Sequence, residues 1–86
     1  MKFPFSLVSP LREVFSDRVD QVNAAGVEGS FGVLAGHAPF MTALKDGRRV
    51  HVFTDGDERV FELNGGFADV TPEGLTILAE EVVEVS

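Results

Sequence analysis

Two histidines are the residues of this chain whose side chains could do chemistry. His37 could act as a general base or a metal ligand, but no Ser, Cys or carboxylate stands next to it in the sequence. A lone histidine rarely builds a catalytic site, which favours a loop residue that hydrogen-bonds to the backbone or contacts a partner. His51 alternates with Val50 and Val52, so we expect it to face outward on a strand. Two histidines also cannot fill a three-histidine zinc site.

The acidic and glycine-rich segments have no catalytic or cofactor spacing either. Asp55, Asp57 and Glu58 cluster at an expected hairpin tip, yet they lack the spaced oxygen ligands of a calcium loop. The glycine-rich stretch 28–47 contains no Gly-Lys-Ser/Thr, so it does not read as a phosphate-binding loop. We therefore predict a chain that is not an enzyme, with no catalytic residues, no metal and no cofactor.

Composition narrows the class of partner. The 86 residues form one domain, predicted to span 1–86, and carry a net charge of −7. A nucleic-acid binder needs the opposite sign, so charged partners should present basic patches. No cysteine is present, and no apolar run approaches the roughly 18 residues of a membrane span. The first residues also lack the apolar core of a signal peptide.

The elements that position these residues are predicted to be strands. Turn signals recur along the whole chain and no segment shows a useful helical period, which is typical of a sandwich or barrel. We predict an all-β flattened sandwich of nine to ten short strands in two sheets. Asp55-Gly56 is the strongest hairpin signal, and Gly65-Gly66 is expected to reverse the chain. Turning residues are also expected at Ser16-Asp17, and a β-bulge near Asp20-Gln21.

The most unusual segment is a short loop between two apolar runs. Gly36 permits a positive φ, while Pro39 fixes its own φ and pushes Ala38 out of the helical region. We therefore expect a rigid, shaped loop. Phe40 and Met41 follow it directly and are expected to be exposed, where an apolar patch marks an interface.

The same segment resembles the signature of a known family. The run EGSFGVLAGHAPFMTALKDG is similar to that of the epsilon subunit of the F-type ATP synthase. The resemblance continues through Asn64–Phe67 and Leu75–Glu80, so it covers essentially the whole chain, with Ala35 replacing a common Pro and Ser30 replacing an occasional Glu. The positions that fall on the signature are Glu28, Gly29, Gly32, Gly36, His37, Ala38, Pro39, Thr42, Leu44 and Gly47.

The resemblance implies a two-sheet sandwich and a mechanical function. It implies a non-catalytic rotor subunit in the central stalk of a proton-translocating complex, which couples the gamma subunit to the ring of c subunits during ATP synthesis. The expected location is the cytoplasmic face of the bacterial inner membrane. Position matching implies that one group of residues faces the c-ring, namely Glu28, Gly29 and Ser30. A second group is expected to face gamma, namely His37, Phe40, Met41 and Thr42.

The resemblance also implies a segment that these residues do not supply. Most bacterial members continue into two helices that can block ATP hydrolysis and that in some members bind ATP. The final residues, Glu81–Ser86, are too short and too β-branched for a helix pair. If these residues are the whole chain, we expect coupling without this helical brake and no binding of ATP; if they are part of a longer chain, the missing part would restore the brake. The alternative is a free-standing β-sandwich that binds a ligand or protein through its 28–47 region.

Overall fold

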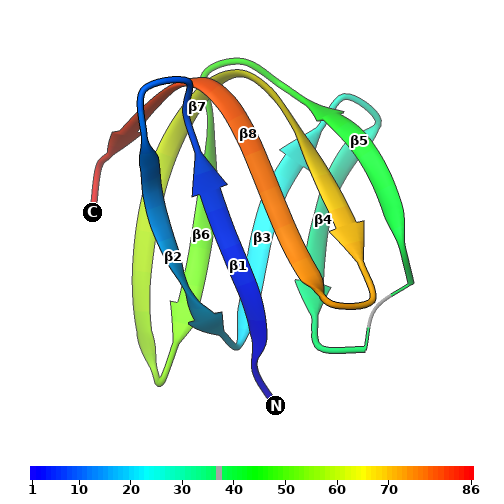
Figure 1. The fold of residues 1–86 in the computed structure, drawn as a ribbon. Coiled ribbons are helices and arrows are strands. Elements are labelled where there is room, and N and C mark those ends of the chain that lie inside the picture. The colour runs from blue at the N-terminus through cyan, green and yellow to red at the C-terminus, as the bar shows by residue number, and fades with distance from the viewer. Residues whose placement is uncertain (37) are drawn as a thin grey trace.

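The computed structural model describes residues 1–36 and 38–86, so the prediction for His37 concerns a residue outside the described part. Within that part the chain is all-β, as predicted, and no helix is long and apolar enough to cross a membrane. Figure 1 shows the strands, which are β1 (Phe3–Val8), β2 (Glu13–Val19), β3 (Gln21–Gly26), β4 (Gly29–Leu34), β5 (Phe40–Leu44), β6 (Arg48–Thr54), β7 (Asp57–Thr71) and β8 (Gly74–Glu84).

One hydrogen-bonded sheet folds over on itself to make the sandwich. Its strand order is β2-β1-β8-β7-β5-β3-β4, and β6 pairs with both β3 and β7. The β1–β8 pair is parallel, whereas the other pairs are antiparallel. In Figure 1, β1 and β8 pass in front of β3 and β6, so the chain forms two facing layers.

The core lies between these layers and follows from the two-residue period of the strands. Alternate side chains of β1 and β8 are buried, and those of β3 and β6 meet them from the other layer. No polar or charged residue of the described part is buried. The core is therefore held by apolar packing, and its members include Phe3, Phe5, Leu7, Val22, Val50, Val52, Phe61, Leu75 and Ile77.

The described part has eight strands instead of nine to ten, because one expected turn is absent. The reversal predicted at Gly65-Gly66 is wrong: β7 runs on through both glycines for 15 residues. Its register with β8 is the same on both sides of Gly65, from Phe61 opposite Glu84 to Thr71 opposite Gly74. On its other side β7 changes partner at this point, from β6 to β5.

Hydrogen bonds from a neighbouring turn stabilise this change of partner. The Gly65 N–H donates to Asp46 Oδ1 at 2.5 Å, and the Gly47 N–H donates to Asn64 Oδ1 at 2.7 Å. Gly65 has a φ of +61°, which a residue with a side chain rarely adopts. The glycine pair is therefore a bend inside a long strand.

The start of the chain differs from the expectation in a similar way. Ser16 and Asp17 lie inside β2, so the turn predicted there is wrong. Asp20 separates β2 from β3, at the place where a β-bulge was expected, and the chain changes from pairing with β1 to pairing with β4 and β6. The irregularity lies earlier instead: Leu7 pairs with Phe15 and Val8 with Glu13, which leaves Val14 as an extra residue.

An ion pair ties the end of β8 to the sandwich. Arg59 donates to both carboxylate oxygens of Glu84, at 2.8 Å each. Its guanidinium also lies over the ring of Phe15, 4.8 Å from the centroid, and over that of Phe61, at 5.4 Å. The bond from Arg59 lowers the pKa of Glu84 from its ordinary value of 4.5.

This ion pair predicts a pH-dependent contribution to stability. Because folding lowers the pKa of Glu84, its contribution is present above pH 4.5 and is lost as the pH falls through the lowered value. We expect Glu84→Gln to be less stable than the parent at neutral pH and to approach it in acid. Urea denaturation across this range measures the difference, and Glu73→Gln, in the exposed β7–β8 turn, is the control. A difference that did not shrink in acid would contradict the linkage.

Candidate protein-binding surface

An apolar row crosses the outer face of four neighbouring strands. Ala43 of β5 pairs with Phe67 of β7, Phe67 pairs with Leu78 of β8, and Leu78 pairs with Val8 of β1. These residues point away from the core because their strand neighbours point into it. Phe67 is 39% exposed and Leu78 is 38% exposed. We call these four residues the apolar row.

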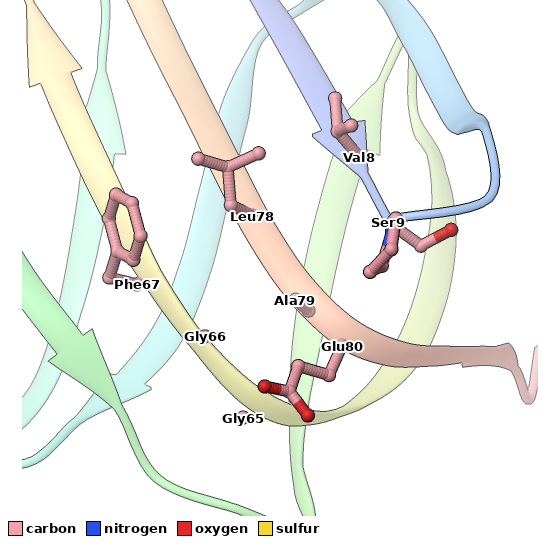
Figure 2. A pocket seen from close by; sticks show the side chains of 9 residues that line it. Val8, Ser9, Gly65, Gly66, Phe67, Leu78, Ala79 and Glu80 are labelled. Atoms are coloured by element: carbon pink, nitrogen blue, oxygen red, sulfur yellow. The ribbon is translucent and has the colours of Figure 1, made fainter.

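The apolar row borders a shallow groove of about 620 Å³. Figure 2 shows Val8, Leu78 and Phe67 on three adjacent strands, with Gly65 and Gly66 at one end of the groove. The two glycines contribute no side chain at this end, where the Glu80 side chain lies beside Gly65. The lining residues are Val8, Ser9, Pro10, Gly65, Gly66, Phe67, Leu78, Ala79 and Glu80.

Of the two exposed residues predicted on β5, Met41 lies next to this row, whereas Phe40 pairs with the buried Val70 on the other face. Met41 is 64% exposed and Phe40 is 39% exposed, which confirms that both reach the surface. Met41 pairs with Asp69 on β7. This is the next outward-facing pair along the two strands after Ala43–Phe67. Thr42 is half-buried and its hydroxyl donates to the carbonyl of Ala43 at 3.2 Å. Met41 therefore extends the exposed apolar surface along β5.

The other predicted site residues lie at turns. Glu28 lies in the turn between β3 and β4, and Gly29 and Ser30 begin β4; all three are exposed. Gly36 has a φ of +82° and sits in a turn after β4, while Pro39 directly precedes β5. The turn that carries Glu28 adjoins β5, because the Val27 N–H donates to the carbonyl of Ala43 at 3.0 Å.

The remaining candidate groups do not form a chemical site in the described part. His51 lies on the outer face of β6, with Nδ1 2.6 Å from Glu58 Oε2, and the two side chains are 41% and 45% exposed. No three His, Cys, Asp or Glu residues among 1–36 and 38–86 are arranged to hold a metal ion. The surface is suited to covering by another protein, since its exposed apolar side chains share one face.

All four members of the apolar row were missed in the sequence: Val8, Ala43, Phe67 and Leu78. A signal for Leu78 was available, because Leu75, Ile77 and Ala79 alternate as inward residues and leave a leucine at an outward position. Phe67 was hidden by the turn expected at Gly65-Gly66. With β7 continuous, Phe67 falls on the face opposite Ala68 and Val70, which are buried.

Comparisons with known proteins agree over nearly the whole chain. Residues 2–85 match the family described as ATP synthase, delta/epsilon chain, beta-sandwich domain. The chain is 60% identical over 85 residues to the ATP synthase epsilon chain of Caulobacter vibrioides, covering 99% of this chain and 98% of that relative. It is also 60% identical over 87 residues to the epsilon chain of Hyphomonas neptunium, but spans only 63% of that longer relative.

Solved structures share the fold. A chain in the Euglena gracilis mitochondrial ATP synthase, in a structure of its OSCP, F1 and c-ring, matches with a TM-score of 0.89 and 27% identity, over 96% of this chain and 53% of that one. A chain from a structure of the central stalk and c-ring of the Tetrahymena thermophila mitochondrial ATP synthase matches with a TM-score of 0.81 and 16% identity, over 96% of this chain and 66% of that one. At this identity the match supports the fold alone. The protein therefore belongs to the delta/epsilon chain family of ATP synthase, and residues 2–85 are its β-sandwich domain.

Proposed function

We propose that this chain is a non-catalytic rotor subunit in the central stalk of a proton-translocating F-type ATP synthase. In this role it couples the gamma subunit to the c-ring while it lies at the cytoplasmic face of the bacterial inner membrane. Family membership supports this role over a free-standing binding module. The observation that carries the proposal is the apolar row with Met41 beside it.

The apolar row is our candidate contact for gamma. Contiguous exposed apolar side chains on one face of a small soluble domain mark a surface that a partner covers. Phe67 and Leu78 lie side by side in register, so a partner's side chain can occupy the groove beside them and lose contact with water. Met41 is expected to continue this contact along β5, while Phe40 and Thr42 alternate to the other face of that strand. These two residues and His37 stay proposed gamma contacts.

The turn between β3 and β4 is our candidate contact for the c-ring. Glu28, Gly29 and Ser30 are exposed there, and Glu28 supplies the negative charge for a basic residue of the ring's polar loops. Ser30 carries no charge, so this contact rests on Glu28. The two candidate contacts together allow one small domain to join gamma to the ring.

The internal structure of the domain suits a mechanical role. Its strands belong to one hydrogen-bonded sheet closed around an apolar core. Close packing and a continuous ladder of hydrogen bonds resist deformation, so a torque applied at one contact reaches the other with little internal movement. None of these steps needs a catalytic group or a cofactor.

Binding to the isolated gamma subunit tests this proposal. We expect the purified chain and purified gamma to elute together from a sizing column as a one-to-one complex. The association should persist in high salt, because apolar contacts are not weakened by ionic screening. Separate elution of the two proteins at micromolar concentrations would contradict the role.

A further inference from the structure

The groove beside the apolar row has one charged side chain. Among the described residues that line it, Glu80 alone carries a charge. Figure 2 shows this side chain extending from β8 toward Gly65 of β7, where a Cβ on the glycine would lie 3.4 Å from the Glu80 Cγ. Gly65 has no side chain to cover the carboxylate, and Glu80 is exposed. The apolar groove therefore ends at an accessible negative charge.

The Glu80 carboxylate has no partner among residues 1–36 and 38–86. No hydrogen bond or ion pair joins it to another described residue. One residue along β8, by contrast, Glu81 accepts a hydrogen bond from the Asn64 amide at 3.5 Å. The other polar side chain at the groove, Ser9, donates its hydroxyl to the carbonyl of Arg12 at 3.2 Å. The groove thus offers a partner an unpaired carboxylate.

The spacing of the groove residues suits a long basic side chain. Leu78 and Glu80 both line the groove and stand two residues apart on β8, so roughly 7 Å separates them along the strand. Phe67 lies directly across from Leu78 on β7. Arginine and lysine lay an aliphatic stem along apolar surface and keep the charged head at a polar end. A stem beside Leu78 and Phe67 would bring its head to Glu80.

We propose that gamma places an arginine in this groove, with its stem along Phe67 and Leu78 and its guanidinium on the Glu80 carboxylate. This inference rests on the proposed function, which supplies gamma as the partner. Arginine fits better than lysine, because a planar guanidinium makes two parallel hydrogen bonds to a carboxylate and also stacks on an aromatic ring. The net charge of −7 agrees with a basic residue on the partner.

The chain contains the same arrangement of groups within its own fold. Arg59 donates to both carboxylate oxygens of Glu84 while its guanidinium lies over two phenylalanine rings. Glu80 is an earlier glutamate of the same strand, and Phe67 supplies a ring at the groove, but no arginine is among the described lining residues. An arginine from gamma would complete this set of contacts.

The affinity of charge-neutral variants for purified gamma tests the inference. Glu80→Gln keeps the size of the side chain and is expected to bind gamma at least about tenfold more weakly, since hydrogen bonds to charged groups are the strong ones. Glu81→Gln is the matched control, because it removes the same charge from the next residue, which does not line the groove. We expect its affinity to stay within about twofold of the parent. Circular dichroism checks that both variants are folded.

A double-mutant cycle identifies the residue of gamma. Each arginine of gamma is replaced by methionine in turn, and each gamma variant is titrated with the parent chain and with Glu80→Gln. One of these gamma variants should bind the parent at least about tenfold more weakly than unchanged gamma does. The same replacement should change the affinity for Glu80→Gln less than about twofold, because the ion pair is already absent there.

The outcomes distinguish this inference from the rotor role. If Glu80→Gln bound gamma as tightly as the parent, or if Glu81→Gln lost as much affinity, the ion pair would be overturned and the rotor role would stand. A loss in Glu80→Gln that is coupled to no arginine of gamma would also overturn it. Failure of gamma to bind the parent chain at all would overturn both.

Discussion

Replacing Gly66 by alanine is expected to lower the free energy of unfolding by about 3 kcal/mol, the upper end for overpacking. A Cβ on Gly66 would run into the carbonyl oxygen of Leu78, and it would lie 2.9 Å from the Ala79 Cα. Both obstacles are backbone atoms of β8, so no side chain can rotate away. The strands β7 and β8 would have to separate locally, at the end of the groove.

Gly47→Ala is the matched control for this variant. Gly47 has a φ of +70°, but a Cβ there would meet nothing within 4 Å. Replacing Gly47 by alanine is therefore expected to lower the free energy of unfolding only by the strain of the left-handed conformation, about 1 kcal/mol. Urea denaturation of both variants measures the difference. If both variants lost the same free energy of unfolding, the strands at Gly66 would accommodate a Cβ without strain, which would contradict the close approach of β7 and β8.

Replacing Phe67 and Leu78 together by aspartate is expected to weaken binding to gamma at least about 100-fold, which corresponds to roughly 3 kcal/mol. The variant places two carboxylates next to each other in the surface that gamma is proposed to cover, and burial of unpaired charge is strongly unfavourable. Both side chains point outward and are partly exposed, so the fold is expected to persist. Titration of labelled variant with gamma measures the affinity.

Val83→Asp is the control for a charge on any exposed apolar residue. Val83 is 60% exposed, near the end of β8, and does not line the groove. We expect its affinity for gamma to stay within about twofold of the parent, since surface substitutions away from a contact have small effects. Circular dichroism checks that each variant is folded. If the variant with both Phe67 and Leu78 replaced bound gamma as tightly as the parent does, the apolar row would not be part of the gamma contact.

Local patterns predicted the fold class and the tightest turns. At Asp55-Gly56 the φ values are +53° and +84°, as a two-residue hairpin of this sequence requires. The exposure of Phe40 and Met41 was also predicted, because a rigid loop directly precedes them. Each of these predictions depends on a few consecutive residues, and such residues carry their own conformational preferences.

The bend at Gly65 and the apolar row could not be predicted in the same way. A glycine pair is compatible with a reversal and with a bend, and the choice here depends on β5 and β6, two strands that pair with the same side of β7. The apolar row joins residues from four strands, so it exists only once the register is formed. The partner surface that covers the row depends on the partner's own sequence, so it cannot be predicted from this chain.

Rotation of this chain during catalysis tests the rotor role most directly. The complex would be fixed to a surface through its catalytic sector, and a bead would be attached to this chain through a cysteine introduced at Glu73, which is exposed in the β7–β8 turn. The chain has no cysteine of its own, so the attachment is specific. We expect the bead to turn in one direction when ATP is hydrolysed. A bead that stays fixed while a bead on gamma turns would contradict the account.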